Sequence, residues 1–271
     1  MNTTLLLVGC GKMGSSLLEG WLERGIAPNA INIIEPNADV GKQLSQDKGV
    51  SVLASPADIA DNYQPEIIVF AVKPQIMADT VPDFKRFSGT GTVFLSIAAG
   101  KTIEFFENHL GAAAPIVRSM PNTPAAIQRG IAAVCANAPV TKAQRSLCQK
   151  LLEAVSEVIW IEDETLMDAV TAVSGSGPAY IFLLAECMAK AGIAAGLPTD
   201  LADQLARATV AGSGEMLHQM TDAPSTLREN VTSPGGTTAA ALDVLMAKDG
   251  LESLLTNAIA AATARSKELA D

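Results

Sequence analysis

Short apolar runs alternate with amphipathic stretches over the first 163 residues of the chain. Gly, Pro, Asn or Ser bounds each run, and the stretches between the runs carry apolar residues at helical spacing. This alternation is typical of a parallel sheet covered by helices on both faces. We predict strands at 5–8, 31–34, 67–72 and 92–97, further short strands at 116–117, 131–135 and 158–161, and helices at 15–24 and 142–154.

From residue 164 onward the apolar pattern is helical throughout. Residues 164–271 hold 23 alanines and only two aromatic residues, and they show no strand pattern. Thr226 to Glu229 fits a capping box, which marks a helix start. The sequence therefore predicts an α/β domain over residues 1–163, with a mostly parallel, doubly wound sheet, and an all-α domain over residues 164–271. We predict helices at 164–173, 178–195, 199–220, 237–247 and 250–269.

Composition and charge narrow the class of protein. The chain has 271 residues, of which 48% are hydrophobic and 18% charged, so it can fold around a sizeable core. Its 19 Lys and Arg against 29 Asp and Glu give a net charge of −10, which argues against binding nucleic acid. The apolar run at the N-terminus is too short for a signal peptide or membrane anchor. We expect a cytoplasmic protein that binds neither membrane nor nucleic acid.

The strongest local motif follows the first predicted strand. Gly9, Gly11 and Gly14 form a GxGxxG pattern that opens a helix. The first glycine allows a tight turn, the second lets backbone approach a pyrophosphate, and the third lets the helix pack on the strand. Lys12 and Met13 lie inside the motif. The order strand, motif, helix, strand predicts a Rossmann dinucleotide-binding domain, although a glycine-rich turn without a ligand is the alternative.

An acidic residue ends the second predicted strand. Glu35 lies 21 positions after Gly14, where an acid usually bonds the ribose hydroxyls of NAD and repels the extra phosphate of NADP. Pro36 and Asn37 follow, without an Arg that would hold a phosphate. On charge alone this position favours NADH, unless the side chain points to solvent instead.

Three further segments lie where the sheet would meet a cofactor. Lys73 follows the third long strand, and ligands bind beyond the carboxyl ends of such strands. Ala98, in Ser-Ile-Ala-Ala-Gly, leaves room for a flat ring. Asn122 lies between two prolines in a rigid loop that can present its amide to a ligand. The alternative for Lys73 is a surface lysine before a turn, and the alternative for the loop around Asn122 is a stiff connector that binds no ligand.

Two loops in the second half interrupt helical patterns. Ser174 to Pro178 reads Ser-Gly-Ser-Gly-Pro and leaves backbone open to close approach, or else marks a break in helix packing. The segment from Ser233 to Thr238 reads Ser-Pro-Gly-Gly-Thr-Thr and opens an alanine-rich helix. Its N–H groups, its hydroxyls and the helix dipole suit a carboxylate. Cys and His show no zinc spacing, so we expect no metal site.

Taken together, these segments resemble the pyrroline-5-carboxylate reductase family, over nearly the whole chain. The matching segments are GCGKMG at 9–14, AVKPQ at 71–75, SIAAG at 96–100, RSMPNTP at 118–124, ETLMDAVTAVSGSGPAY at 164–180 and LRENVTSPGGTTAAAL at 227–242. The resemblance implies a Rossmann domain followed by a helical dimerisation domain, assembled as a homodimer, with larger rings of dimers in many members. It also implies an NAD(P)H-dependent oxidoreductase that reduces 1-pyrroline-5-carboxylate to L-proline, the last step of proline biosynthesis.

The resemblance also implies roles for individual residues. Ser174 to Pro178 would lie near the nicotinamide, and Thr238 would be the catalytic residue, with its hydroxyl directed at the substrate nitrogen. The substrate carboxylate would be bound by Ser233, Gly235, Gly236, Thr237 and Thr238. The cofactor, NADP(H) or NAD(H), would be bound by Gly9, Gly11, Lys12, Met13, Gly14, Glu35, Asn37, Val72, Lys73, Pro74, Ala98 and Asn122. Family members commonly use NADPH, whereas the acidic side chain of Glu35 at the ribose position would disfavour the extra phosphate of that cofactor.

Other functions fit part of the pattern. A β-hydroxyacid dehydrogenase has the same two-domain plan, but its expected lysine is absent from residues 164–184. A reductase acting on another cyclic imine or ketimine shares the fold, and a non-catalytic nicotinamide-nucleotide sensor would share the cofactor motif. The Ser233 to Thr238 loop favours an enzyme with a substrate over such a sensor.

Overall fold

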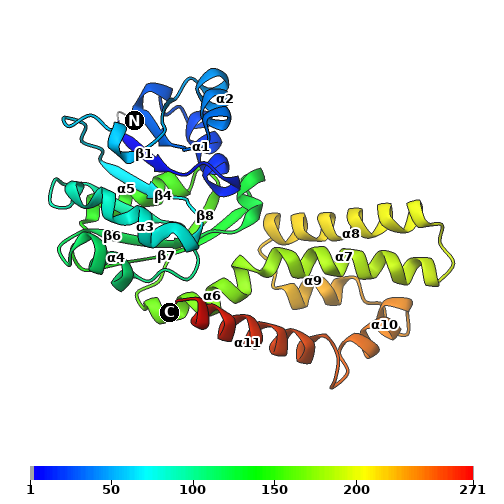
Figure 1. The fold of residues 1–271 in the computed structure, drawn as a ribbon. Helices are drawn as coiled ribbons and strands as arrows, with labels where there is room; N and C mark the ends of the chain where they lie inside the picture. The colour runs from blue at the N-terminus through cyan, green and yellow to red at the C-terminus, as the bar shows by residue number, and fades with distance from the viewer. Residues whose placement is uncertain (1–2, 271) are drawn as a thin grey trace. The chain divides into compact units, whose positions relative to one another are not determined.

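The chain folds into two compact units, as seen in the computed structural model, which describes residues 3–270. The first unit consists of the chain up to Gly175 together with the C-terminal residues from Thr263 onward. The second unit is Ser176–Ala262. Figure 1 shows the sheet in the first unit and helices alone in the second.

The sheet has eight strands in the order β3-β2-β1-β4-β5-β6-β7-β8. Every neighbouring pair is parallel except β6 and β7, which are antiparallel. The predicted mostly parallel, doubly wound sheet is confirmed, and β3 is a strand that the pattern did not predict. The strands are β1 (Leu5–Val8), β2 (Ile31–Ile34), β3 (Ser51–Leu53), β4 (Ile67–Phe70), β5 (Val93–Ser96), β6 (Ile116–Met120), β7 (Gly130–Ala136) and β8 (Ser156–Trp160).

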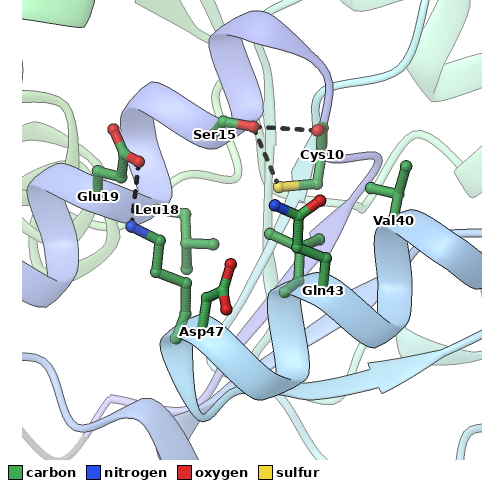
Figure 2. A pocket seen from close by; sticks show the side chains of 9 residues that line it. Cys10, Ser15, Leu18, Glu19, Val40, Gln43 and Asp47 are labelled. Carbon is green, nitrogen blue, oxygen red and sulfur yellow. Dashed lines mark hydrogen bonds and ion pairs between the residues drawn. The ribbon is translucent and has the colours of Figure 1, made fainter.

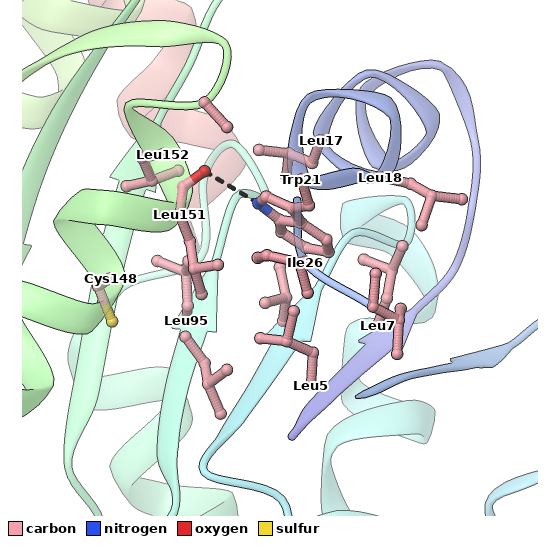
Figure 3. Close-up of a cluster of buried hydrophobic side chains, with 14 of the residues drawn as sticks. Leu5, Leu7, Leu17, Leu18, Trp21, Ile26, Leu95, Cys148, Leu151 and Leu152 are labelled. Atoms are coloured by element: carbon pink, nitrogen blue, oxygen red, sulfur yellow. Dashed lines mark hydrogen bonds between the residues drawn. The ribbon is translucent and has the colours of Figure 1, made fainter. Parts of the chain in front are cut away.

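Helices cover both faces of this sheet and bury its side chains. The helices of the unit up to β8 are α1 (Lys12–Glu23), α2 (Ala38–Lys48), α3 (Met77–Thr80), α4 (Ile103–Leu110) and α5 (Lys142–Leu152). On one face, Trp21 of α1 is fully buried, and its indole N–H donates to the carbonyl of Leu151 at 2.9 Å (Figure 3). On the other face, the ring of Phe70 packs against Phe84, Phe94 and Phe106.

After β8, every described residue that belongs to a regular element is helical. A short 3-10 turn (Glu164–Leu166) precedes α6 (Met167–Val170), and a π-helical segment (Thr171–Gly175) follows it. The helix predicted at 164–173 is therefore divided into three types of turn. The later helices are α7 (Gly177–Ala194), α8 (Thr199–Gln219), α9 (Pro224–Asn230), α10 (Thr237–Leu245) and α11 (Leu251–Ala270). The capping box at Thr226 is wrong, because Thr226 lies inside α9, which begins after Ala223.

The sheet unit extends past residue 163, where the sequence pattern changes. Asp168 of α6 accepts a hydrogen bond from the hydroxyl of Ser266 in α11, at 2.7 Å. A Cβ on Gly100 would lie 3.0 Å from the carbonyl oxygen of Leu269, so this end of α11 also packs closely on the loop after β5. These contacts join the first helical turns after β8, and the end of the chain, to the sheet unit.

Candidate functional site

The strand order reverses at β1, which has β2 on one side and β4 on the other. In open sheets of this kind, ligands bind at such a reversal, beyond the carboxyl ends of the strands. Gly9 follows β1 and lies against the segment that follows β4, since a Cβ on Gly9 would come 2.6 Å from Cγ1 of Val72. The predicted cofactor residues near Gly9 and Val72 therefore lie side by side at the expected edge.

The three glycines of the motif have distinct local environments. Gly9 has a φ of +87°, a left-handed conformation that favours glycine. A Cβ on Gly14 would lie 2.7 Å from the carbonyl oxygen of Gly9, so helix α1 can pack this closely only without a side chain there. A Cβ on Gly11, in contrast, would meet no atom within 4 Å. Gly11 thus borders open space in front of α1.

The N-terminus of α1 suits an anion. Gly11 is its cap residue, with no side-chain bond to the first amides, and the first turn holds no acidic residue. Uncapped N–H groups and the helix dipole together attract a phosphate. Lys12 begins the helix and is exposed, whereas Met13 packs against the core cluster.

Glu35 is bound to backbone on both of its oxygens. Oε2 accepts the N–H of Cys10 at 3.4 Å, and Oε1 accepts the N–H of Asn37 at 3.0 Å. The Asn37 side chain in turn caps α2, because its Oδ1 accepts the N–H groups of Asp39 and Val40. Glu35 is therefore turned toward the glycine-rich loop.

A cavity of about 230 Å³ lies beside this loop, between α1 and α2 (Figure 2). The hydroxyl of Ser15 donates to the carbonyl of Cys10 at 3.1 Å and lies 3.6 Å from its Sγ. Burial raises the pKa of the Cys10 thiol. None of the predicted cofactor residues lines the cavity, whose lining is Cys10, Ser15, Leu18, Glu19, Val40, Gln43, Leu44, Asp47 and Lys48.

The segments after β4 and β5 place the next predicted residues. Lys73 is exposed and precedes a 3-10 turn (Pro74–Ile76), so its ammonium group is accessible to a ligand. Ala98 is 5% exposed, and its N–H donates to Oγ of Ser96 at 3.2 Å. Two alanines and a glycine, at positions 98–100, thus follow Ile97 in the segment after β5.

Asn122 has a defined amide orientation. Its Oδ1 accepts the N–H of Ile131 at 2.9 Å, which fixes the loop after β6 to the start of β7. The Asn122 amide nitrogen is the donor that remains for a ligand.

The Ser174 to Pro178 segment spans the division between the two units. The hydroxyl of Ser174 donates a hydrogen bond to the backbone carbonyl of Val170, at 3.1 Å. A Cβ on Gly175 would overlap Cε of Met120, so Gly175 permits close packing on β6. π-helical turns occur frequently at functional sites.

In the second unit, the loop before α10 has the features of a carboxylate site. Gly235 has a φ of +70°, and the N–H of Gly236 donates to the carbonyl of Ser233 at 3.0 Å, which closes a tight turn. Gly236 is the cap residue of α10, with no side-chain bond to the first amides and no acidic residue in the first turn. Thr237 and Thr238 are the first two residues of the helix, and Thr238 is half-buried.

Sequence reasoning missed one pair in the sheet unit. Arg118 in β6 forms an ion pair with Glu164, at 2.7 Å, and the Arg118 side chain is 6% exposed. An arginine directly after the apolar pair Ile116 and Val117 was the available signal, because a buried guanidinium needs a carboxylate partner. Among residues 3–270, no group of three or more His, Cys, Asp or Glu side chains is placed to hold a metal ion.

Two family models match the chain. The model described as pyrroline-5-carboxylate reductase dimerisation matches residues 164–269, and the model described as NADP oxidoreductase coenzyme F420-dependent matches residues 4–100. The first covers the helical half, and the second covers the glycine motif and the strands around it.

Curated relatives cover nearly the whole length. A pyrroline-5-carboxylate reductase of Pseudomonas aeruginosa is 38% identical over 98% of this chain and 97% of its own, and one of Pisum sativum is 36% identical over 98% and 96%. Among solved structures, a pyrroline-5-carboxylate reductase from Coxiella burnetii superposes with a TM-score of 0.94 at 34% identity, covering 100% of both chains. The Plasmodium falciparum pyrroline carboxylate reductase, solved with NADP bound, superposes with a TM-score of 0.84 at 30% identity, covering 100% of this chain and 99% of its own.

Proposed function

The chain belongs to the pyrroline-5-carboxylate reductase family, and we propose which of its residues bind the cofactor, which bind the substrate and which takes part in proton transfer. The protein is an NAD(P)H-dependent oxidoreductase that reduces the C=N bond of 1-pyrroline-5-carboxylate to L-proline, the last step of proline biosynthesis. The roles of single residues below are our proposal.

The residues at the reversal of the sheet fit a nicotinamide dinucleotide. The open space beside Gly11 and the uncapped amides of α1 suit the pyrophosphate. Glu35 and Asn37 would contact the adenosine ribose, and Lys12 and Met13 would flank the pyrophosphate. When bound, the cofactor supplies a hydride, that is, a proton with two electrons. The remaining contacts would come from Gly9, Gly14, Val72, Lys73, Pro74, Ala98 and Asn122.

The loop before α10 would bind the substrate carboxylate. The Gly235 turn and the first amides of α10 supply N–H donors, and Ser233, Thr237 and Thr238 supply hydroxyls. Several donors at a helix N-terminus hold a carboxylate in one orientation. No side chain caps α10 in the described structure, and this leaves its first amides available to a substrate carboxylate.

Reduction of the imine requires a hydride at carbon and a proton at nitrogen. The protonated imine accepts the hydride at its carbon, and the electron pair of the C=N bond moves to nitrogen. The Thr238 hydroxyl would hydrogen-bond this nitrogen and relay a proton to it from solvent, so that the imine is protonated when it accepts the hydride. The other residues orient the two rings, an effect worth at most about 7–11 kcal/mol.

The protein acts on a small molecule and assembles as a homo-oligomer, as its dimerisation-domain match indicates. We propose a homodimer formed through the helical half, and rings of dimers as its further assembly. Within residues 3–270, one continuous helical stretch, Glu164–Ala194, which ends with α7, is long and apolar enough to span a membrane by length and composition, but only 11% of its apolar window is buried within the chain. Coverage by a second copy would bury these side chains, so we propose a cytoplasmic enzyme that binds neither membrane nor nucleic acid.

Purified protein tests the function directly. Adding 1-pyrroline-5-carboxylate to enzyme and NADH or NADPH should remove the reduced-nicotinamide absorbance and form an equal amount of proline. Absorbance loss with another cyclic imine alone would favour a different imine reductase, and no loss with any imine would favour a sensor. Sedimentation of dilute protein tests the assembly, since a stable folded monomer would contradict the dimer.

A further inference from the structure

One carboxylate oxygen joins three separate segments of the sheet unit. Oε1 of Glu164 accepts a hydrogen bond from Nη1 of Arg118 at 2.7 Å and another from the backbone N–H of Ile103 at 2.9 Å. The Arg118 side chain is 6% exposed and that of Glu164 29%. The pair is thus largely removed from water, where an ion pair with good geometry orients its partners strongly.

Two of these segments lead to predicted cofactor residues. Arg118 in β6 lies opposite Ser96 in β5, and Oγ of Ser96 accepts the N–H of Ala98 at 3.2 Å. Asn122 lies four residues after Arg118 on the same segment. Ile103, the first residue of α4, follows the Ala98 loop and ties its far end to Glu164.

The third segment is the one that Glu164 itself begins. It continues through α6 and the π-helical turns to Gly175, which packs against Met120 of β6. The chain between Glu164 and Gly175 is therefore attached to β6 at both ends. Ser174, whose segment the family resemblance places near the nicotinamide, lies on this stretch.

We propose that Glu164 is a positioning residue for the nicotinamide end of the cofactor site, an inference that rests on the proposed function. Its carboxylate fixes the positions of the three segments that carry Ala98, Asn122 and Ser174 relative to one another. The residues assigned to the adenosine end, from Gly9 to Asn37, have no bond to Glu164 in the described structure. Loss of the carboxylate therefore loosens one end of the site and leaves the other intact.

The test compares two ligands that share the adenosine end. Adenosine diphosphate ribose lacks the nicotinamide, whereas NADH or NADPH carries it. Glu164→Ala should weaken binding of the reduced dinucleotide by about tenfold, which corresponds to about 1.4 kcal/mol, and leave binding of adenosine diphosphate ribose unchanged. Calorimetric titration measures both. Glu164→Gln, which keeps an acceptor for the Ile103 N–H, should restore part of the loss.

Asp168→Asn is the matched control. Asp168 lies four residues after Glu164 and also anchors its segment, but its partner is the hydroxyl of Ser266 in α11, a helix that carries none of the predicted cofactor residues. It should lower the melting temperature without changing the ratio of the two affinities. Equal losses for both ligands in Glu164→Ala and Glu164→Gln, or the same ratio change in Asp168→Asn, would show a purely structural role. If the wild-type protein binds neither dinucleotide, the proposed function falls with the inference. If the wild-type protein binds and turns over normally but Glu164→Ala shows no selective loss for the reduced dinucleotide, only the inference falls.

Discussion

The carboxylate of Glu35 accepts the backbone N–H of Asn37, with 3.0 Å between Oε1 and the nitrogen. Its second oxygen accepts the N–H of Cys10, and the Asn37 side chain accepts the N–H groups of Asp39 and Val40. The backbone N–H groups of Cys10 and Asn37 are thus already bonded to the carboxylate of Glu35.

This arrangement predicts how cofactor preference responds to substitution. Glu35→Ser removes the charge and frees the two N–H groups, so the affinity for NADPH relative to NADH should rise by about tenfold. Glu35→Arg should raise it further by adding a cation. Fluorescence titration with both dinucleotides measures the ratio, and Glu157→Gln on the exposed surface of β8 is the control. An unchanged ratio in both Glu35 variants would show that Glu35 does not face the ribose.

The glycine motif permits a matched pair of substitutions three residues apart. In Gly14→Ala the new Cβ would lie 2.7 Å from the Gly9 carbonyl oxygen, so we expect a loss of about 1–3 kcal/mol in the free energy of unfolding. In Gly11→Ala the Cβ meets no atom within 4 Å, so stability should be retained. Cofactor affinity should nevertheless fall by about tenfold or more, because the methyl group enters the space assigned to the pyrophosphate. Normal affinity in a folded Gly11→Ala protein would argue against binding at this turn.

Thr238→Ala separates chemistry from cofactor binding. Removal of an aligned hydroxyl should lower kcat by about 10²-fold, while the Kd of the reduced dinucleotide stays nearly constant. Thr238→Ser, which keeps the hydroxyl, should recover most of the turnover, and Thr221→Ala on the exposed loop before α9 should change neither quantity. A parallel loss of cofactor affinity in Thr238→Ala would make this residue structural instead.

Buried thiols predict a loss of stability at alkaline pH. Burial raises the pKa of Cys135 to about 12, with the nearby Glu164 carboxylate adding to the effect, and raises the pKa of Cys148 further. Above about pH 9 the unfolded chain loses these thiol protons and the folded chain keeps them. The free energy of unfolding should therefore fall with pH, by up to about 1.4 kcal/mol per pH unit for each thiol.

Urea denaturation between about pH 8 and pH 11 measures this slope. Cys148→Ala should make the slope shallower, and Glu157→Gln, at an exposed position in β8 that holds no thiol, should leave it unchanged. Identical slopes in all three proteins would mean that the Cys148 thiol ionises as readily in the folded chain as in the unfolded one.

Local patterns predicted most of the sheet. Strands such as Leu5–Val8 and Ile31–Ile34 appear at the predicted residues, because short apolar runs between turn residues are typical of buried parallel strands. The three-residue strand β3 was missed, since its pairing with β2 rather than its own sequence makes it a strand. The division of the helix after Glu164 was also missed. Its π-helical turns end at Gly175, whose contact with Met120 joins residues 55 positions apart.

The candidate site likewise combines features carried by neighbouring residues with contacts between residues far apart in the sequence. The glycines and the loop before α10 carry their signal in neighbouring residues, so their spacing was enough to propose them as site residues. The bond from Glu164 to Arg118 spans 46 residues, and that from Glu164 to Ile103 spans 61. No local pattern contains these contacts, and only the folded sheet brings them together.

Reduction by this protein requires that a hydrogen of the reduced cofactor pass to the imine carbon, and an isotope label shows whether it does. Enzyme, 1-pyrroline-5-carboxylate and reduced dinucleotide deuterated at the transferring position of the nicotinamide should yield proline that carries one deuterium on the former imine carbon. Mass spectrometry and NMR of the product locate the label. Unlabelled proline, or no proline at all, would contradict direct hydride transfer by this protein.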